Sequence, residues 1–86
     1  MNLAELFGFL GGLFLTVGMV PQVCKLFILK SAYEISLTFI VSLIFGIFFW
    51  LIYGILNMLF PVVFWNAIGL ILVLLMLYAK LKWGQK

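Results

Sequence analysis

Three long apolar stretches, separated by two short polar breaks, make up most of the chain. They run over Leu3–Leu29, Leu37–Leu56 and Pro61–Leu81. Each reaches or exceeds the ~20 residues that a helix needs to cross about 30 Å of hydrocarbon. Only helices and closed barrels cross a bilayer, because every backbone N–H and C=O needs a partner within the protein. Three stretches cannot close a barrel, so the pattern predicts an all-α integral membrane protein with three transmembrane helices.

The two breaks indicate how the helices connect. The first, at residues 30–36, holds Lys, Ser, Tyr and Glu, and Ser36 is a suitable N-cap for the second helix. The second, at residues 57–60, is very short, and Pro61 suits the first turn of the third helix. The second and third helices are therefore expected to be antiparallel neighbours. The length of 86 residues allows one domain, residues 1–86.

The charged residues predict the orientation in the membrane. The chain has five lysines and two glutamates, with no Asp, Arg or His, and its net charge is +3. With three crossings, the first break and the C-terminus share one side, and all five lysines fall there. The positive-inside rule places this side in the cytoplasm, with the N-terminus and the turn at Asn57 outside.

The composition argues against an enzyme. There is no histidine, no acid pair, no glycine-rich phosphate loop, and Cys24 is the single cysteine. We therefore expect no catalysis, no metal and no cofactor, and the sparse positive charge predicts no nucleic-acid partner. Ionisable residues at membrane depth mark proton relays and sites for charged substrates. The central parts of the three stretches hold none, which favours a neutral, hydroxyl-rich solute moving down its own gradient.

Three helices are too few to enclose such a solute. A sugar-sized pocket needs roughly 300 Å³ or more, and transporters usually build their path from two related halves. The chain contains no internal repeat that would supply the second half. A two-fold homodimer is the commonest closed solution. Because both copies obey the same lysine rule, we expect a parallel homodimer in the lipid bilayer.

Pro21 is the sharpest local signal in the first helix. It removes the amide hydrogen bond to Val17 and clashes with that carbonyl, which bends or loosens a helix. At a 1.5 Å rise it lies about 27 Å from Leu3, near the expected cytoplasmic end. The Gln22 amide is able to bond the freed carbonyls. The pair is either a hinge for an inner gate or a static kink.

Trp50 and Asn66 form a candidate binding pair. They lie at depths of about 10 Å and 7–8 Å from the outer turn, on adjacent helices. Gly46 and Gly54 flank Trp50 by one turn on each side and leave a slot beside its ring. Sugars offer apolar faces to such a ring and hydroxyls to a carboxamide, which both donates and accepts. The alternatives are helix packing for Trp50 and a helix–helix hydrogen bond for Asn66.

Small and aromatic residues suggest where helices touch and where the membrane ends. The segment Gly8–Gly12, with Gly11 and Gly18, predicts a tight contact face. Thr16, one turn after Gly12, either faces the path or bonds back to its own helix. Three further aromatic residues suit the interfacial belts, one outer and two inner: Trp65, Tyr78 and Trp83.

The same residues carry a family resemblance. A Pro21–Gln22 pair near the inner end of the first of three spans resembles the PQ-loop superfamily. Together with Trp50, Tyr53 and Asn66 at these spacings, the whole chain resembles the bacterial SemiSWEET sugar transporters. The resemblance implies a parallel homodimer of three-helix bundles, with helix three between one and two, in the bacterial inner membrane. It also implies facilitated transport of mono- or disaccharides by alternating access.

The resemblance further implies roles for single residues. Trp50 and Asn66 would contact the substrate. The hinge and the inner gate would be formed by Pro21, Gln22 and Phe45. Tyr53 would belong to the outer gate. Relatives can reinforce the outer gate with an Arg and an Asp just after that tyrosine. Here Asn57 and Leu59 hold those positions and cannot form an ion pair. The outer gate is therefore expected to close through Tyr53, Asn57 and apolar contacts.

Two other functions stay open at this point. One is a PQ-loop carrier for another neutral solute, such as an amino acid or a vitamin. The other is a structural or pore-forming small membrane protein such as a holin. A pore leaks without saturation or solute preference, whereas a carrier shows both.

Overall fold

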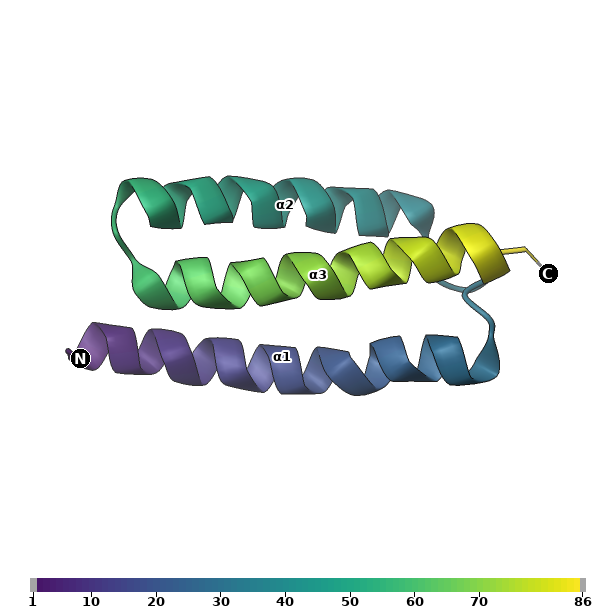
Figure 1. Ribbon diagram of the computed structural model, residues 1–86, viewed down its shortest axis with the longest axis horizontal. Coiled ribbons are helices and arrows are strands. Elements are labelled where there is room, and N and C mark those ends of the chain that lie inside the picture. Colours follow the sequence, from purple (N-terminus) through teal and green to yellow (C-terminus); the bar gives the residue numbers. More distant parts are fainter. Residues whose placement is uncertain (1, 86) are drawn as a thin grey trace.

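Three helices make up most of the computed structural model, which describes residues 2–85 (Figure 1). They are α1 (Leu3–Leu29), α2 (Leu37–Leu56) and α3 (Phe60–Trp83). The bounds of α1 and α2 coincide with the expected ranges, whereas α3 begins one residue earlier and ends two residues later. Pro61 occupies the first turn of α3, and the lysines of its last turn favour its C-terminal end. All three helices are long and apolar enough to cross a membrane.

α3 lies between α1 and α2 (Figure 1). It packs against both, while no Cα of α1 comes within 8 Å of a Cα of α2. α2 runs antiparallel to α3, and α1 runs parallel to α3, so residues 30–36 and the C-terminal end of α3 share one end of the bundle. The expected order, with helix three between one and two, is confirmed.

Local hydrogen bonds explain where the helices begin. The Asn2 side chain accepts a bond from the Glu5 amide at 2.7 Å, and the Ser36 hydroxyl accepts one from the Phe39 amide at 3.2 Å. Each bond satisfies one of the amides that the first turn of a helix leaves without a partner. The N-cap predicted at Ser36 is therefore confirmed.

The turn between α2 and α3 places a bulky residue in a backbone conformation that favours glycine. Met58 has a φ of 55°, and its side chain is 90% exposed. The left-handed conformation destabilises the folded state by about 1–2 kcal/mol for a residue with a side chain. Glycine avoids this strain, but part of the gain is lost because glycine has more conformational freedom in the unfolded chain. We expect Met58→Gly to raise the free energy of unfolding by about 0.5–1 kcal/mol, measured by thermal unfolding in detergent.

A matched control for this substitution lies within α3. Ile71 is 61% exposed in the middle of that helix, so Ile71→Gly is expected to cost about 1 kcal/mol through helix propensity. If Met58→Gly lowers the melting temperature as Ile71→Gly does, the left-handed backbone of Met58 is not a source of strain.

The buried core is small and lies toward the end that carries the first break. Its fully packed side chains come from all three helices and are Val23, Ile40, Val73 and Met76. Most other large apolar side chains are exposed, including Leu15, Leu56 and Leu81. An apolar exterior suits a molecule whose surroundings are lipid tails, and the described residues bury no charged or polar side chain in the core.

At the opposite end, glycines bring α1 against α3. A Cβ on Gly8 would lie 3.1 Å from the Pro61 side chain, and a Cβ on Gly12 would overlap the indole of Trp65. The contact face expected from Gly8 and Gly12 is confirmed. Gly11 and Gly18 have open space where a Cβ would be, so their assignment to this face was wrong.

Polar contacts tie the first break to the end of α3. The Lys80 ammonium donates to the carbonyls of Ala32 and Tyr33, at 3.3 and 3.1 Å. The Ala32 amide donates to the Trp83 carbonyl at 3.0 Å. The ring of Phe27 in α1 also stacks on Tyr78, with 6.0 Å between ring centroids. Hydrogen bonds thus join the first break to the end of α3. Among residues 2–85, the contact between α1 and α3 at Gly8 and Gly12 is one of packing.

Candidate functional site

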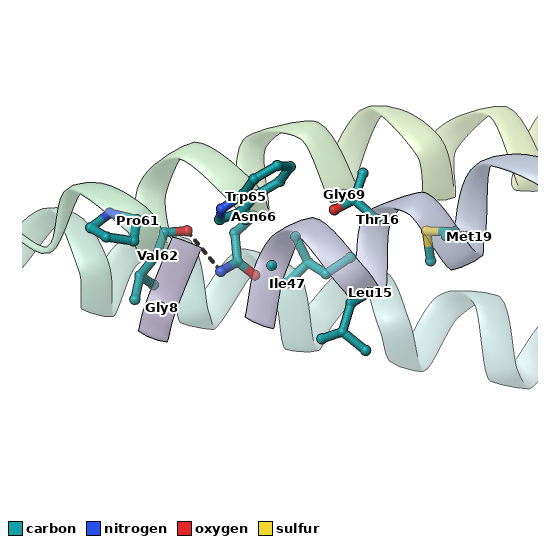
Figure 2. A pocket seen from close by; sticks show the side chains of 11 residues that line it. Gly8, Leu15, Thr16, Met19, Ile47, Pro61, Val62, Trp65, Asn66 and Gly69 are labelled. Atoms are coloured by element: carbon teal, nitrogen blue, oxygen red, sulfur yellow. Dashed lines mark hydrogen bonds between the residues drawn. The ribbon is translucent and has the colours of Figure 1, made fainter. Parts of the chain in front are cut away.

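A cavity of about 300 Å³ lies in the half of the bundle near the turn between α2 and α3, the half that the sequence predicts to be outer (Figure 2). Its walls come from all three helices and are almost entirely apolar. The lining residues are Gly8, Gly12, Leu15, Thr16, Met19, Ile47, Pro61, Val62, Trp65, Asn66 and Gly69. Polar side-chain atoms are contributed by Thr16, Trp65 and Asn66 alone. We call this space the outer cavity.

A second cavity, of about 530 Å³, continues the same groove toward the first break. Its walls come from α1, the break, α2 and α3. The lining residues are Leu15, Met19, Gln22, Leu26, Glu34, Ile35, Ser36, Phe39, Leu43 and Met76. We call it the inner cavity. Leu15 and Met19 line both cavities, so these two side chains stand between the outer and inner halves of one groove.

Asn66 lies in the wall of the outer cavity and is half-buried. Its Nδ2 donates to the Val62 carbonyl one turn earlier, at 2.8 Å, and its Oδ1 lies on the other side of the carboxamide (Figure 2). Because this bond stays within α3, Asn66 does not link two helices. Its oxygen and its second N–H are left to serve the cavity.

Trp50 lies on α2 in a separate, open hollow. It is 56% exposed and meets the Tyr53 ring edge to face, with 5.2 Å between centroids. Gly46 lines the same hollow and has open space beside it, as the expected slot requires. Gly54, by contrast, is buried against the Val62 side chain and serves packing. Within one chain, Trp50 and Asn66 therefore line different cavities.

The proline–glutamine pair lies beside the inner cavity. α1 continues through Pro21 without interruption. Gln22 is exposed and lines the inner cavity together with Glu34. Within residues 2–85, its amide makes no hydrogen bond to the carbonyls that Pro21 leaves free.

Phe45 lies away from the groove. It is 59% exposed and lines none of the five cavities described in the structure. Five residues along a helix turn it about 140° from Trp50. Sequence reasoning missed Phe39 and Leu43, which line the inner cavity. A stripe spaced three and four residues apart would have identified them, because it runs through Phe39, Leu43, Gly46, Trp50 and Tyr53.

The expected outer-gate residues lie at the end of α2. The Asn57 Nδ2 donates to the Tyr53 carbonyl at 2.9 Å, so its side chain caps its own helix. The Tyr53 ring is half exposed and packs on Trp50. The structure thus brings Tyr53 to Trp50 and gives Asn57 a backbone partner.

Trp65 was expected in an outer aromatic belt but lies in the wall of the outer cavity. Its indole rests on Gly12 and packs against Phe9 and Phe64, with centroid distances of 6.3 and 4.9 Å. Its Nε1 is buried and, among the described residues, is the one buried side-chain N or O atom without a hydrogen-bond partner. The sequence signal for this position is Gly12, whose missing Cβ leaves room for a ring.

The side chains that line the outer cavity offer hydrogen bonds and carry no charge. In the part of the chain that the structure describes, no three His, Cys, Asp or Glu side chains gather as metal ligands. An amide, a hydroxyl and apolar walls are suited to reversible binding of a neutral polar molecule.

Comparisons with known proteins agree with this arrangement. The family described as PQ loop repeat matches residues 3–63. A protein of Leptospira biflexa named sugar transporter SemiSWEET is 30% identical over 82 residues, which cover 95% of this chain and 96% of that protein. A protein of Bradyrhizobium diazoefficiens with the same name is 35% identical over 82 residues and 95% of both chains.

A solved structure has the same fold. The crystal structure of a bacterial homologue of SWEET transporters matches with a TM-score of 0.90 and 35% identity, covering 96% of this chain and 100% of that one. The matches extend over nearly the full length of the relatives as well as of this chain. The resemblance based on Pro21–Gln22, Trp50 and Asn66 is therefore confirmed: this chain belongs to the PQ-loop family and, within it, to the SemiSWEET proteins.

Proposed function

We propose that this chain is a sugar transporter that carries neutral mono- or disaccharides down their gradient. The two relatives at 30% and 35% identity are named sugar transporters. The observation that carries the proposal is the uncharged outer cavity with the Asn66 carboxamide in its wall. A carboxamide and sugar hydroxyls exchange hydrogen bonds in both directions. We expect no enzymatic activity, no cofactor and no nucleic-acid partner.

The active unit is a parallel homodimer. In one chain Trp50 is 56% exposed, and its hollow and the outer cavity are both open on a side. A two-fold partner covers such a surface with its own copy. Facing grooves would then surround one central site with two Trp50 rings and two Asn66 carboxamides.

Transport proceeds by alternating access. Bending at Pro21, with Gln22 beside it, opens the inner cavity while the region of Tyr53 and Asn57 closes the outer side. Phe45 stays the inner-gate residue that the family resemblance implies, and we add Phe39 and Leu43 to that gate because they line the inner cavity. The first break, the C-terminus and the lysines face the cytoplasm of a bacterial cell, across its inner membrane, and the N-terminus lies outside.

The decisive experiment is a sugar panel in proteoliposomes of the purified protein. Uptake of labelled glucose or sucrose should saturate with concentration and be competed by unlabelled sugars. Linear, non-selective leakage would identify a pore. Saturable uptake of amino acids or vitamins with no sugar competition would identify a carrier of another solute.

We expect the rate of sugar uptake to be independent of a pH gradient. α2 contains no Asp, Glu, Lys, Arg or His, and between Glu5 and Lys25 α1 contains none either. Without such a group at depth, no proton relay crosses the groove. Uptake should therefore change less than two-fold when the pH difference across the liposome is reversed.

Glu34 provides the control for proton coupling. It is the one carboxylate in the wall of the inner cavity. Should uptake follow the pH gradient in the natural protein and lose that dependence in Glu34→Gln, transport is coupled to protons through this side chain and the uniport mechanism is wrong.

A further inference from the structure

Three polar side chains line the outer cavity, and one of them, Asn66, uses part of its hydrogen-bonding capacity within α3. One N–H of the carboxamide is bonded to the Val62 carbonyl at 2.8 Å. A sugar hydroxyl that donates to the remaining Oδ1 still has an oxygen that needs a donor, because each hydroxyl both donates and accepts. The cavity wall offers this donor at Thr16 and Trp65.

The Thr16 hydroxyl is available to a ligand. In a helix a threonine commonly bonds back to the carbonyl four residues earlier, here that of Gly12. Within residues 2–85 the Thr16 hydroxyl makes no such bond. In Figure 2 its oxygen is on the side of the residue that faces Asn66 and Trp65. Of the two alternatives for Thr16, the structure favours the path over the bond to its own helix.

The Trp65 indole is a donor that the present packing covers. Its Nε1 is buried without a partner, and the ring lies against the backbone of α1 at Gly12. A buried donor left unsatisfied destabilises the folded state, because it has lost its hydrogen bond to water and gained none in return. Movement of α1 away from α3 would expose this N–H at the wall of the outer cavity, where a sugar oxygen could accept from it.

We propose, on the basis of the proposed sugar transport, that Thr16 and Trp65 complete the sugar site beside Asn66. The Thr16 hydroxyl binds the sugar with α1 packed as it is here, and the Trp65 N–H binds it after α1 has moved off the ring. A ligand shifts a conformational equilibrium only by its difference in affinity for the two states. The Trp65 N–H provides such a difference, so sugar binding itself favours separation of α1 from α3.

Two conservative variants test the proposal. Thr16→Val keeps the shape and removes the hydroxyl, and Trp65→Phe keeps an aromatic ring and removes the N–H. Each should raise the half-saturation concentration for glucose or sucrose by roughly three- to ten-fold, the effect of one neutral hydrogen bond. Trp65→Phe removes the unsatisfied donor and also part of a ring that packs against Phe9 and Phe64. The half-saturation concentration is therefore compared between samples of folded protein, because a merely structural tryptophan would change the amount of folded protein and leave this concentration unchanged.

The controls make the same chemical changes away from the groove. Thr38 is exposed on α2 and lines none of the five cavities, and Trp83 lies at the far end of α3. Thr38→Val and Trp83→Phe should keep the half-saturation concentration within two-fold of the natural protein. A series of deoxyglucoses identifies the bonded hydroxyl, since its removal should cost less in Thr16→Val than in the natural protein.

The outcomes separate this proposal from the function on which it rests. If the natural protein takes up neither glucose nor sucrose, the proposed function fails and the inference with it. If the natural protein is active and both variants stay within two-fold of its half-saturation concentration, the inference alone is overturned. Equal losses in Thr38→Val and Trp83→Phe would overturn it as well.

Discussion

Replacing Asn66 with alanine is expected to reduce sugar uptake by roughly 10- to 100-fold at subsaturating sugar. Asn66 supplies an amide oxygen and a free N–H to the outer cavity. In a dimer the substitution removes the Asn66 carboxamide from both subunits, and each hydrogen bond that is lost contributes about 0.5–1.5 kcal/mol to sugar binding. Initial rates of labelled glucose or sucrose uptake in liposomes measure the effect.

Asn57 provides a matched control for stability. Its carboxamide makes the same bond to the carbonyl four residues earlier, from Nδ2 to the Tyr53 carbonyl at 2.9 Å, but it lies outside the outer cavity. Asn57→Ala and Asn66→Ala should therefore lower the melting temperature by similar amounts. A variant Asn66→Ala that is folded and transports at the natural rate would remove Asn66 from the site.

The fold followed from composition and spacing to an unusual degree. In a membrane, each crossing needs a long apolar run, so the runs themselves predict the helices. The order of the helices came from the family resemblance, because apolar periodicity is weak when lipid and protein neighbours are equally apolar. The extra residues of α3, Phe60, Lys82 and Trp83, lie at helix ends, where pattern is least informative.

The candidate site was predicted residue by residue but not as an arrangement. Depth along a helix follows from counting residues, and it placed Trp50 and Asn66 at similar levels. The direction around the helix decides which cavity a side chain enters, and it separates Trp50 from Asn66 and turns Phe45 away from the groove. Trp65 escaped prediction because its position depends on Gly12 of another helix, which no local pattern in α3 reports.

Replacing Gly12 with alanine is expected to destabilise the contact between α1 and α3 by about 1–3 kcal/mol. The new Cβ would overlap the base of the Trp65 indole, at Cγ, Cδ1 and Cδ2, which cannot turn aside as the tip of a flexible side chain would. Phe9 and Phe64 pack around the ring and limit its movement. The effect appears as a lower melting temperature in detergent and less folded protein.

Gly11→Ala is the matched control, one residue earlier on the same helix. Both substitutions gain about 1 kcal/mol of helix propensity, but a Cβ on Gly11 meets open space. The two variants should therefore move the melting temperature in opposite directions, and Trp65→Ala should cancel much of the Gly12→Ala loss because it removes the overlapping ring. Equal melting temperatures for Gly11→Ala and Gly12→Ala would mean that α1 and α3 are not in contact at Gly12. The covered Trp65 N–H, which depends on that contact, would then be exposed in every state.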